Sequence, residues 1–292
     1  MSTLEIQNST IPQATLGDEF QLRGIGIFSG RNVGFVAKPA DPDTGIIFKL
    51  GKILIPARIE YVEDVPNRTR LRKDGVMIQV VEHLVSALRG LGVDNAIIEP
   101  DSDELPILDA SAKDYVELIL KCGLVKQSEI KTILVVNEPV YEIENGMLLA
   151  LLPDSSSRVT YFLDHLHPQI GKMADSLELT AENYRDFIGP ARTFATREEA
   201  EYMIKNKIVG TDDENLAIVI GTDGPNAQLR HPLEYVHHKM LDMIGDLSLA
   251  SWPIRGHILG VKSGHGMNRK LARKIAELLR EASEKGNLNV IP

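Results

Sequence analysis

The feature that most constrains the fold is a line of ionisable residues inside the apolar segment HHKMLDMIGD, residues 237–246. His238, Asp242 and Asp246 recur there at intervals of four residues. With about 3.6 residues per helical turn, the three side chains fall in one narrow stripe on a helix. Buried ionisable groups destabilise a protein strongly unless they are paired or bind a metal ion. The fold must therefore bring partners to this stripe.

Composition places the chain among ordinary globular proteins. It has 292 residues, 43% apolar and 25% charged, which suits one large domain or two of average size. The net charge of −9 disfavours nonspecific binding to nucleic acid or to an anionic membrane, because both require a basic surface. Cys122 is the single cysteine, which excludes an internal disulfide and a cysteine-based zinc site.

No segment of the sequence indicates export or membrane insertion. The N-terminus lacks a basic segment followed by an apolar core, and no apolar run approaches the roughly 18 residues of a membrane span. We therefore expect a cytoplasmic protein that does not insert stably into a membrane. We also expect a monomer that binds no nucleic acid.

The first part of the chain predicts strands followed by helices. Residues 20–60 alternate short apolar runs with turn residues, which is typical of strands and hairpins. Helical periodicity follows over 78–90 and 109–123, with a strand at 93–100 between them.

The polar segment 126–132 begins a second strand-rich stretch. Beyond it, the sequence predicts helices at 180–188, 196–206, 233–250 and 267–285, and strands at 216–221 and 256–264. The order of element types resembles that of the first part. We therefore expect an α+β fold of two α/β domains, residues 1–127 and 128–292.

Residues from two predicted helices form a candidate metal site. The i,i+4 pair His238 and Asp242 presents two ligand atoms to one point, and His83 in VVEHLVSAL is a candidate third ligand. Three ligands that leave one position free for water suit metal-assisted hydrolysis. Glu82, beside His83, is then a candidate general base.

His265 is a candidate acid for the same reaction. It lies between two glycines in KSGHGMN, at a predicted strand-to-helix turn, where side chains are exposed. Asp246 is placed to orient a histidine. Each motif alone has a simpler explanation, because Glu–His pairs commonly lie on solvated helix faces and helical His–Asp pairs commonly form hydrogen bonds. His237 falls about 100° from His238 around the helix and should point away from the site.

Five motifs occur in a characteristic order: VEHLVSALRGLGVDNAIIE, ELPILDASA, ARTF, HHKMLDMIGD and KSGHGMNRKL. Together they resemble the zinc-dependent UDP-3-O-acyl-N-acetylglucosamine deacetylases of lipid A synthesis, and the similarity runs from about residue 20 to about residue 280. The resemblance implies two α/β sandwich domains of related topology, with zinc in the cleft between them. It also implies a βαβ insert in the second domain that forms a hydrophobic passage for the acyl chain.

The resemblance also implies roles at the metal. His83, His238 and Asp242 correspond to the family's zinc ligands, and Glu82 to its general base.

Five further residues acquire roles in the same way. His265 corresponds to the general acid or electrostatic partner of the oxyanion, and Asp246 to the residue that orients it. Thr193 corresponds to a residue that stabilises the oxyanion. Phe194 and Lys239 correspond to residues that lie beside the substrate, the lysine near its polar part.

Two departures from the family pattern bear on the substrate. Phe28 stands where the family usually has histidine. Asp212, Asp213 and Glu214 stand where the family has a glycine- and serine-rich stretch beside its acyl passage. An acidic lining would disfavour a long acyl chain, because desolvating carboxylates against alkane is costly. Alternatively, the three side chains point to solvent.

The main hypothesis is a Zn²⁺-dependent N-deacetylase acting on a UDP-linked, 3-O-acylated N-acetylglucosamine. Two histidines and a carboxylate are also the ligand set of non-haem Fe(II) oxygenases, so a non-haem Fe(II) enzyme is an alternative function and Fe²⁺ an alternative metal. Two other hypotheses stay open. One is a deacetylase of a related sugar with a shorter acyl chain or none, and the other is a non-catalytic protein that binds a sugar nucleotide or lipid.

Overall fold

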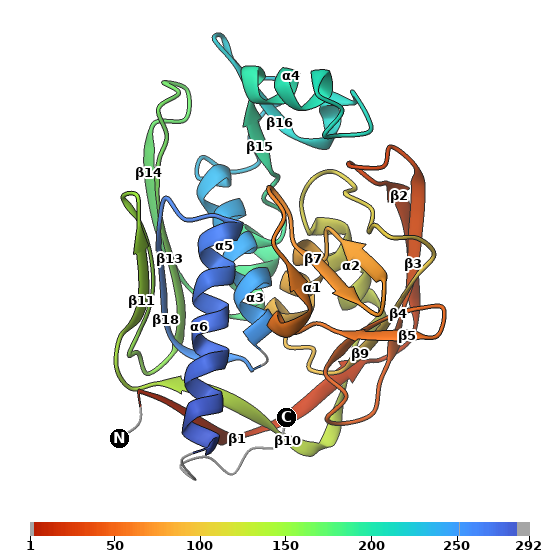
Figure 1. The fold of residues 1–292 in the computed structure, drawn as a ribbon, viewed down its shortest axis with the longest axis vertical. Coiled ribbons are helices and arrows are strands. Elements are labelled where there is room, and N and C mark those ends of the chain that lie inside the picture. Colours follow the sequence, from red (N-terminus) through yellow and green to blue (C-terminus); the bar gives the residue numbers. More distant parts are fainter. Residues whose placement is uncertain (1–2, 251, 285–292) are drawn as a thin grey trace.

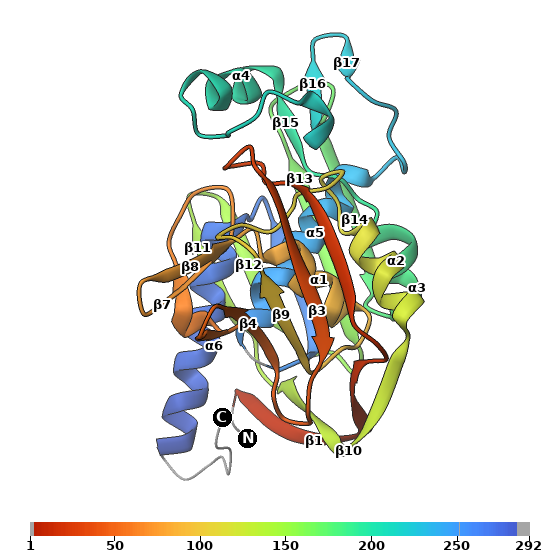
Figure 2. The ribbon, with the colours of Figure 1, turned by 90° about the vertical axis from the view of Figure 1, so that its right-hand side faces the viewer.

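Two β-sheets form the outer layers of the molecule, and two pairs of helices lie between them (Figures 1 and 2). The computed structural model describes residues 3–250 and 252–284. The inner layers consist of α1 (Glu82–Gly90), α2 (Lys113–Cys122), α5 (Glu234–Leu247) and α6 (His265–Glu284). The α+β fold predicted from the sequence is therefore confirmed. None of the helices within the described residues is long and apolar enough to cross a membrane.

The first sheet has the strand order β2-β3-β9-β4-β5. Its strands are β2 (Phe20–Ile25), β3 (Asn32–Pro39), β4 (Ile46–Leu50), β5 (Ile53–Pro56) and β9 (Ala96–Pro100). All neighbours are antiparallel except β4 and β9. The sheet buries one face on the helices, where Tyr115 of α2 packs on Phe35 of β3 with 5.9 Å between ring centroids. Aromatic contacts of this kind fix how a helix sits on a sheet.

The second sheet is larger and is organised around β18. Its path is β1-β10-β18-β12-β11, and β13 joins β18 to β14. The strands are β1 (Leu4–Leu16), β10 (Leu124–Val136), β11 (Val140–Glu144), β12 (Met147–Leu152), β13 (Ser157–Asp164), β14 (Lys172–Glu178) and β18 (Ile254–Val261). Helices α5 and α6 cover the face of this sheet that looks toward α1 (Figure 1).

Two smaller units complete the fold. A three-stranded sheet precedes α1 and consists of β6 (Val62–Glu63), β7 (Arg70–Lys73) and β8 (Val76–Gln79). The helix predicted over 78–90 therefore begins only at Glu82, because its first residues belong to β8. The other unit projects above the helices and contains β15 (Phe194–Thr196), α4 (Arg197–Lys205), β16 (Ile218–Gly221) and β17 (Gly224–Pro225). Strands β15 and β16 run parallel on either side of α4 in the sequence, which is a βαβ order.

Short helical segments occur elsewhere: η1 (Ile59–Tyr61), α3 (Ala181–Asn183), η2 (Tyr184–Ile188), η3 (Glu214–Leu216) and η4 (Ser248–Ala250). The predicted domain boundary between residues 127 and 128 falls within β10. Because β1 pairs with β10 along most of its length, the N-terminal strand belongs to the second sheet. The division into two domains stays a prediction.

Helices α1 and α5 cross at close range because α5 has a glycine at the crossing point. A Cβ built on Gly245 would overlap the backbone carbonyl of Glu82. Ser86, one turn along α1, donates a hydrogen bond of 2.9 Å to the carbonyl of Leu241. The contact therefore places the start of α1 directly against the ionisable stripe of α5.

We expect Gly245→Ala to destabilise the protein, because the added methyl meets backbone atoms that cannot move aside. The expected loss is about 1–3 kcal/mol in the free energy of unfolding, measured by chemical denaturation. Gly266→Ala is the matched control, since a Cβ at Gly266 meets no atom within 4 Å. Equal stability of the two variants would contradict this account of the helix crossing.

Candidate metal centre and active site

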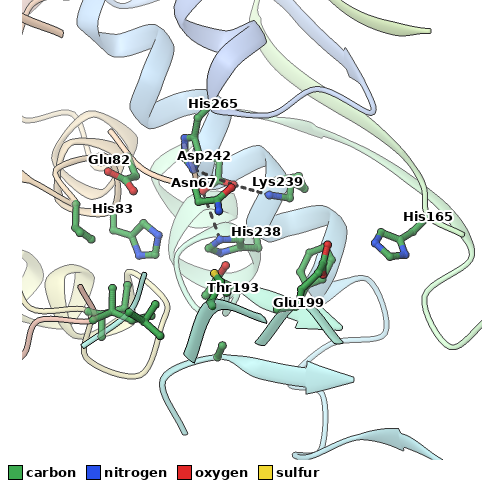
Figure 3. Close-up of a pocket in the computed structure, with 18 of the residues that line it drawn as sticks. Asn67, Glu82, His83, His165, Thr193, Glu199, His238, Lys239, Asp242 and His265 are labelled. Carbon is green, nitrogen blue, oxygen red and sulfur yellow. Dashed lines mark hydrogen bonds and ion pairs between the residues drawn. The ribbon is translucent and has the colours of Figure 1, made fainter. Parts of the chain in front are cut away.

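Three buried side chains converge where α1 meets α5 (Figure 3). His238 and Asp242 lie one turn apart on α5, and His83 reaches them from the start of α1. One ligand atom from each of the three residues lies within 4.8 Å of the others. The structure thus brings together the three metal ligands that the sequence predicted, across 155 residues of chain between the two histidines.

The hydrogen bonds around these residues fit a divalent metal ion. His238 Nδ1 lies 3.0 Å from the carbonyl oxygen of Ala191, within hydrogen-bonding distance. The other ring nitrogen, Nε2, is therefore free to bind a metal ion and lies 3.4 Å from Asp242 Oδ1. Within the described residues, Asp242 Oδ1 and His83 Nδ1 are buried without a hydrogen-bond partner. Buried polar atoms are rarely left unpaired in folded proteins. Two imidazoles and one carboxylate form a familiar three-ligand set with an open coordination position.

Protonation of the three residues also suits metal binding. Burial lowers the pKa of His83, and it lowers the pKa of His238 to about 3. Burial opposes ionisation of Asp242, but the positive charges of Lys239 and His265 outweigh it and hold the Asp242 pKa well below its usual range. Neutral imidazoles and an ionised carboxylate are the forms that bind metals.

Glu82 lies beside this cluster at the first position of α1. Its side chain is buried, and its Oε2 accepts a hydrogen bond of 3.1 Å from the backbone N–H of Thr69. Burial raises the pKa of the Glu82 carboxyl to about 7. The group can therefore accept and return a proton near neutral pH, which is what a general base requires.

His265 faces the cluster from the first residue of α6. Its Nδ1 lies 2.8 Å from Asp246 Oδ2, and its Nε2 lies 4.0 Å from Asp242 Oδ2. Burial alone would lower the pKa of His265, but the carboxylates of Asp246 and Asp242 outweigh burial and raise it to about 9. His265 is thus a cation near neutral pH, with one nitrogen held and the other turned toward the metal ligands.

The remaining predicted residues line the same cavity. Thr193 is positioned by its backbone N–H, which donates to the carbonyl of Ala110 at 2.7 Å. Lys239 Nζ lies 2.9 Å from Asp242 Oδ2 and 5.6 Å from the centroid of the Phe194 ring. Burial would lower the pKa of Lys239, but Asp242 outweighs it and raises that pKa. All nine residues predicted from the sequence therefore meet in one place.

The cavity has a volume of about 670 Å³ and combines a polar floor with apolar walls. The apolar walls come from the turn after β2 and from the β15–α4–β16 unit: Ile27, Phe28, Tyr202, Met203, Ile208, Val209 and Ala217. The turn and the unit are joined by a hydrogen bond of 2.9 Å from Gly210 N–H to the carbonyl of Ile27. Phe28, which departs from the family pattern, packs under the guanidinium of Arg68 at 3.9 Å.

The acidic segment before β16 does not contribute to these walls where the structure describes it. Asp212 and Asp213 are exposed and do not line the cavity. The side chain of Glu214 lies outside the described part of the chain. Of the two explanations that the sequence left open, solvent exposure therefore holds for both aspartates.

Several residues at the site were missed by the sequence analysis. Asn67, Tyr161 and His165 line the cavity, and Thr69 bonds both Glu82 and Asp246. Each stands alone in a polar or strand segment without a periodic pattern. The sequence offers no signal for them, because their positions depend on which loops meet at the helix crossing.

The first histidine of the HHK motif, His237, lies outside the site, as predicted from helical geometry. His237 Nε2 lies 2.7 Å from Asp175 Oδ2, and its ring stacks on His231 with 4.8 Å between centroids. His231 is half-buried in this stack.

Adjacent histidines on one helix give a matched test of metal binding. We expect His238→Ala to lose stoichiometric binding of a divalent metal, because it removes one of three ligands. His237→Ala should keep it, because its partner is Asp175. Metal content per chain after dialysis decides the matter, and equal metal content in the two variants would contradict the assignment.

Comparison with known proteins agrees with this geometry. The family model described as UDP-3-O-acyl N-acetylglycosamine deacetylase (LpxC) matches residues 13–277. A UDP-3-O-acyl-N-acetylglucosamine deacetylase of Thermodesulfovibrio yellowstonii is 37% identical over 268 residues, covering 91% of this chain and 92% of the relative. Deacetylases of the same name from Syntrophus aciditrophicus and Chlamydia abortus are 38% and 37% identical, covering 91% of this chain and 86% and 98% of the relatives, respectively.

The match covers the first sheet, the second sheet apart from most of β1, the inner helices apart from the end of α6, and the cavity. Members of this family are metalloenzymes, in agreement with the His–His–Asp cluster. The protein therefore belongs to the UDP-3-O-acyl-N-acetylglucosamine deacetylase family.

Proposed function

We propose that this protein is a Zn²⁺-dependent hydrolase that removes the N-acetyl group from UDP-3-O-acyl-N-acetylglucosamine, the committed step of lipid A synthesis. The observation that carries the proposal is the convergence of a three-ligand metal cluster, a buried carboxyl and a carboxylate-bound histidine in one cavity. Metal-assisted hydrolysis of an amide uses these three parts, and family membership points to the substrate.

His83, His238 and Asp242 would hold the metal ion. When bound there, the ion supplies Lewis acidity that makes water more acidic and polarises a carbonyl group. Glu82 takes a proton from the water that attacks the acetyl carbon. Its raised pKa supports this role, because a carboxyl that titrates near 7 can accept the proton and release it again near neutral pH.

His265 protonates the departing amine as the carbon–nitrogen bond breaks and acetate is released. Asp246 holds the imidazole through Nδ1, so that the opposite nitrogen carries the proton into the cavity. The positive charge of the ring also offsets the negative charge that develops on the carbonyl oxygen. Thr193, on the other wall of the cavity, supplies a hydroxyl for the same oxygen.

Lys239 and Phe194 serve the part of the substrate that does not react. The ammonium of Lys239 is charged, sits at the rim of the metal cluster and faces the Phe194 ring. Polar groups of the sugar nucleotide can bind the ammonium while the sugar packs on the aromatic ring. The apolar walls beside the βαβ unit would hold the acyl chain. Cytoplasmic location and a monomeric state stay predictions from the sequence.

We expect Glu82→Gln to lower kcat by about 10²–10⁴-fold, because the amide keeps the shape of the side chain but cannot accept the proton. Metal content should stay at the wild-type level, since Glu82 is not a ligand. Glu182→Gln, at an exposed position, serves as the control. Near-normal turnover by the Glu82 variant would remove this residue from the role of base.

Acetate release from UDP-3-O-acyl-N-acetylglucosamine, with varied acyl chains, tests the function itself. We expect activity that a chelator abolishes and Zn²⁺ restores, with Fe²⁺ compared in parallel. If the chain lies on the apolar walls, each added methylene should raise kcat/KM up to about fourfold until the passage is filled, since a buried CH₂ contributes about 0.8 kcal/mol. Chelator-insensitive activity, or none with any chain, would overturn the proposal.

A further inference from the structure

One residue outside the predicted site contacts both the base and the residue that holds the acid. Thr69 is fully buried just before β7. Its backbone N–H donates to Glu82 Oε2 at 3.1 Å, and its hydroxyl donates to Asp246 Oδ1 at 2.5 Å. It thus links the start of α1 to the far end of the stripe on α5.

The hydroxyl of Thr69 determines how the Asp246 carboxylate is turned. Asp246 Oδ2 pairs with His265 Nδ1 and accepts from Asn268 Nδ2, each at 2.8 Å. Oδ1 accepts from the Thr69 hydroxyl. With a donor on each oxygen, the carboxylate cannot rotate about its Cβ–Cγ bond without breaking a buried hydrogen bond, which is costly. The plane of the His265 ring therefore depends on the donor at Oδ1.

Thr69 is itself held from both sides. Its carbonyl accepts from Val80 N–H at 3.0 Å, and Val80 has φ 63°, a left-handed conformation that β-branched residues rarely adopt. From the other side, the buried guanidinium of Arg269 on α6 donates to the carbonyls of Arg68 and Val65 at 3.2 and 3.0 Å. The segment that carries Thr69 is therefore bonded to Glu82 at the start of α1 and, through the carbonyls of Arg68 and Val65, to α6.

We propose that Thr69 is a positioning residue that holds the general base and the general acid in a fixed relation to each other. Its N–H fixes the Glu82 carboxyl, and its hydroxyl fixes Asp246 and, through Asp246, the imidazole of His265. This inference rests on the proposed function, because it concerns the efficiency of the same deacetylation. Positioning errors well below 1 Å are sufficient to slow such steps.

Thr69→Val tests the hydroxyl alone, because valine has the same shape and keeps the N–H that serves Glu82. We expect kcat to fall about 10–100-fold, as for other residues that orient ligands or catalytic groups, with KM within about twofold of wild type and metal content unchanged. Thr69→Ser keeps the hydroxyl and should recover most of the loss. Unchanged kcat in Thr69→Val, or metal loss in proportion to activity, would overturn the proposal.

Thr15→Val is the matched control for stability. Thr15 is also buried, and its hydroxyl donates to the Asn95 carbonyl and accepts from Ala40 N–H, but it does not line the cavity. Loss of the Thr15 hydroxyl should lower the melting temperature of the protein without lowering kcat. If Thr69→Val does not fold, Thr69→Ala, which cannot overfill the space, replaces it in every comparison.

A double variant separates positioning from general damage. In a His265→Ala background, assayed at raised enzyme concentration, Thr69→Val should change kcat by less than about twofold, because the group that it positions is gone. If Thr69→Val lowers kcat in that background as much as it does in wild type, the proposal is contradicted. Wild type and Thr15→Val test the function itself, because no acetate release by either would refute the deacetylase assignment. If both release acetate and Thr69→Val has the same kcat as wild type, only the positioning role is refuted.

Discussion

The crossing of α1 and α5 is the contact on which the rest of the site depends. Gly245 has no side chain, so the backbone of Glu82 can lie against α5. This approach puts Glu82 and His83 within reach of His238 and Asp242. It also excludes water from the contact, since the side chains on both sides are buried. A larger residue at position 245 would separate the two halves of the metal cluster.

The same burial acts in opposite directions on the two groups that would carry protons. It raises the pKa of Glu82 to about 7, because a desolvated carboxyl resists ionisation. Burial alone would also lower the pKa of His265, but the carboxylates of Asp246 and Asp242 raise it to about 9. The environment therefore provides a carboxyl ready to accept a proton and an imidazolium ready to donate one. Pairs of titratable groups whose pKa values are moved by different causes are typical of acid–base catalysis.

Different parts of the cavity hold the reacting groups and the apolar surface that would contact the acyl chain. Its floor consists of the polar groups on α1, α5 and α6, which are fixed by hydrogen bonds between buried atoms. Its apolar walls belong to the β15–α4–β16 unit and to the turn that meets it at Gly210. The floor is built into the core, whereas the walls belong to a projecting unit (Figure 1). Sequence changes in that unit can therefore alter which acyl chain the cavity accepts without moving the reacting groups.

The sequence by itself predicted most of the helices, the α+β class and nine candidate site residues that the structure brings together. A stripe such as His238, Asp242 and Asp246 is local, because helical geometry places residues four apart on one face. Family motifs added Thr193 and Phe194, which no periodicity marks. Only the tertiary structure decided that Asp212 and Asp213 are exposed, that β1 joins the second sheet, and that Thr69 bonds two groups of the site. These facts depend on which distant segments meet, and a hydroxyl 177 residues from its partner leaves no pattern in the sequence.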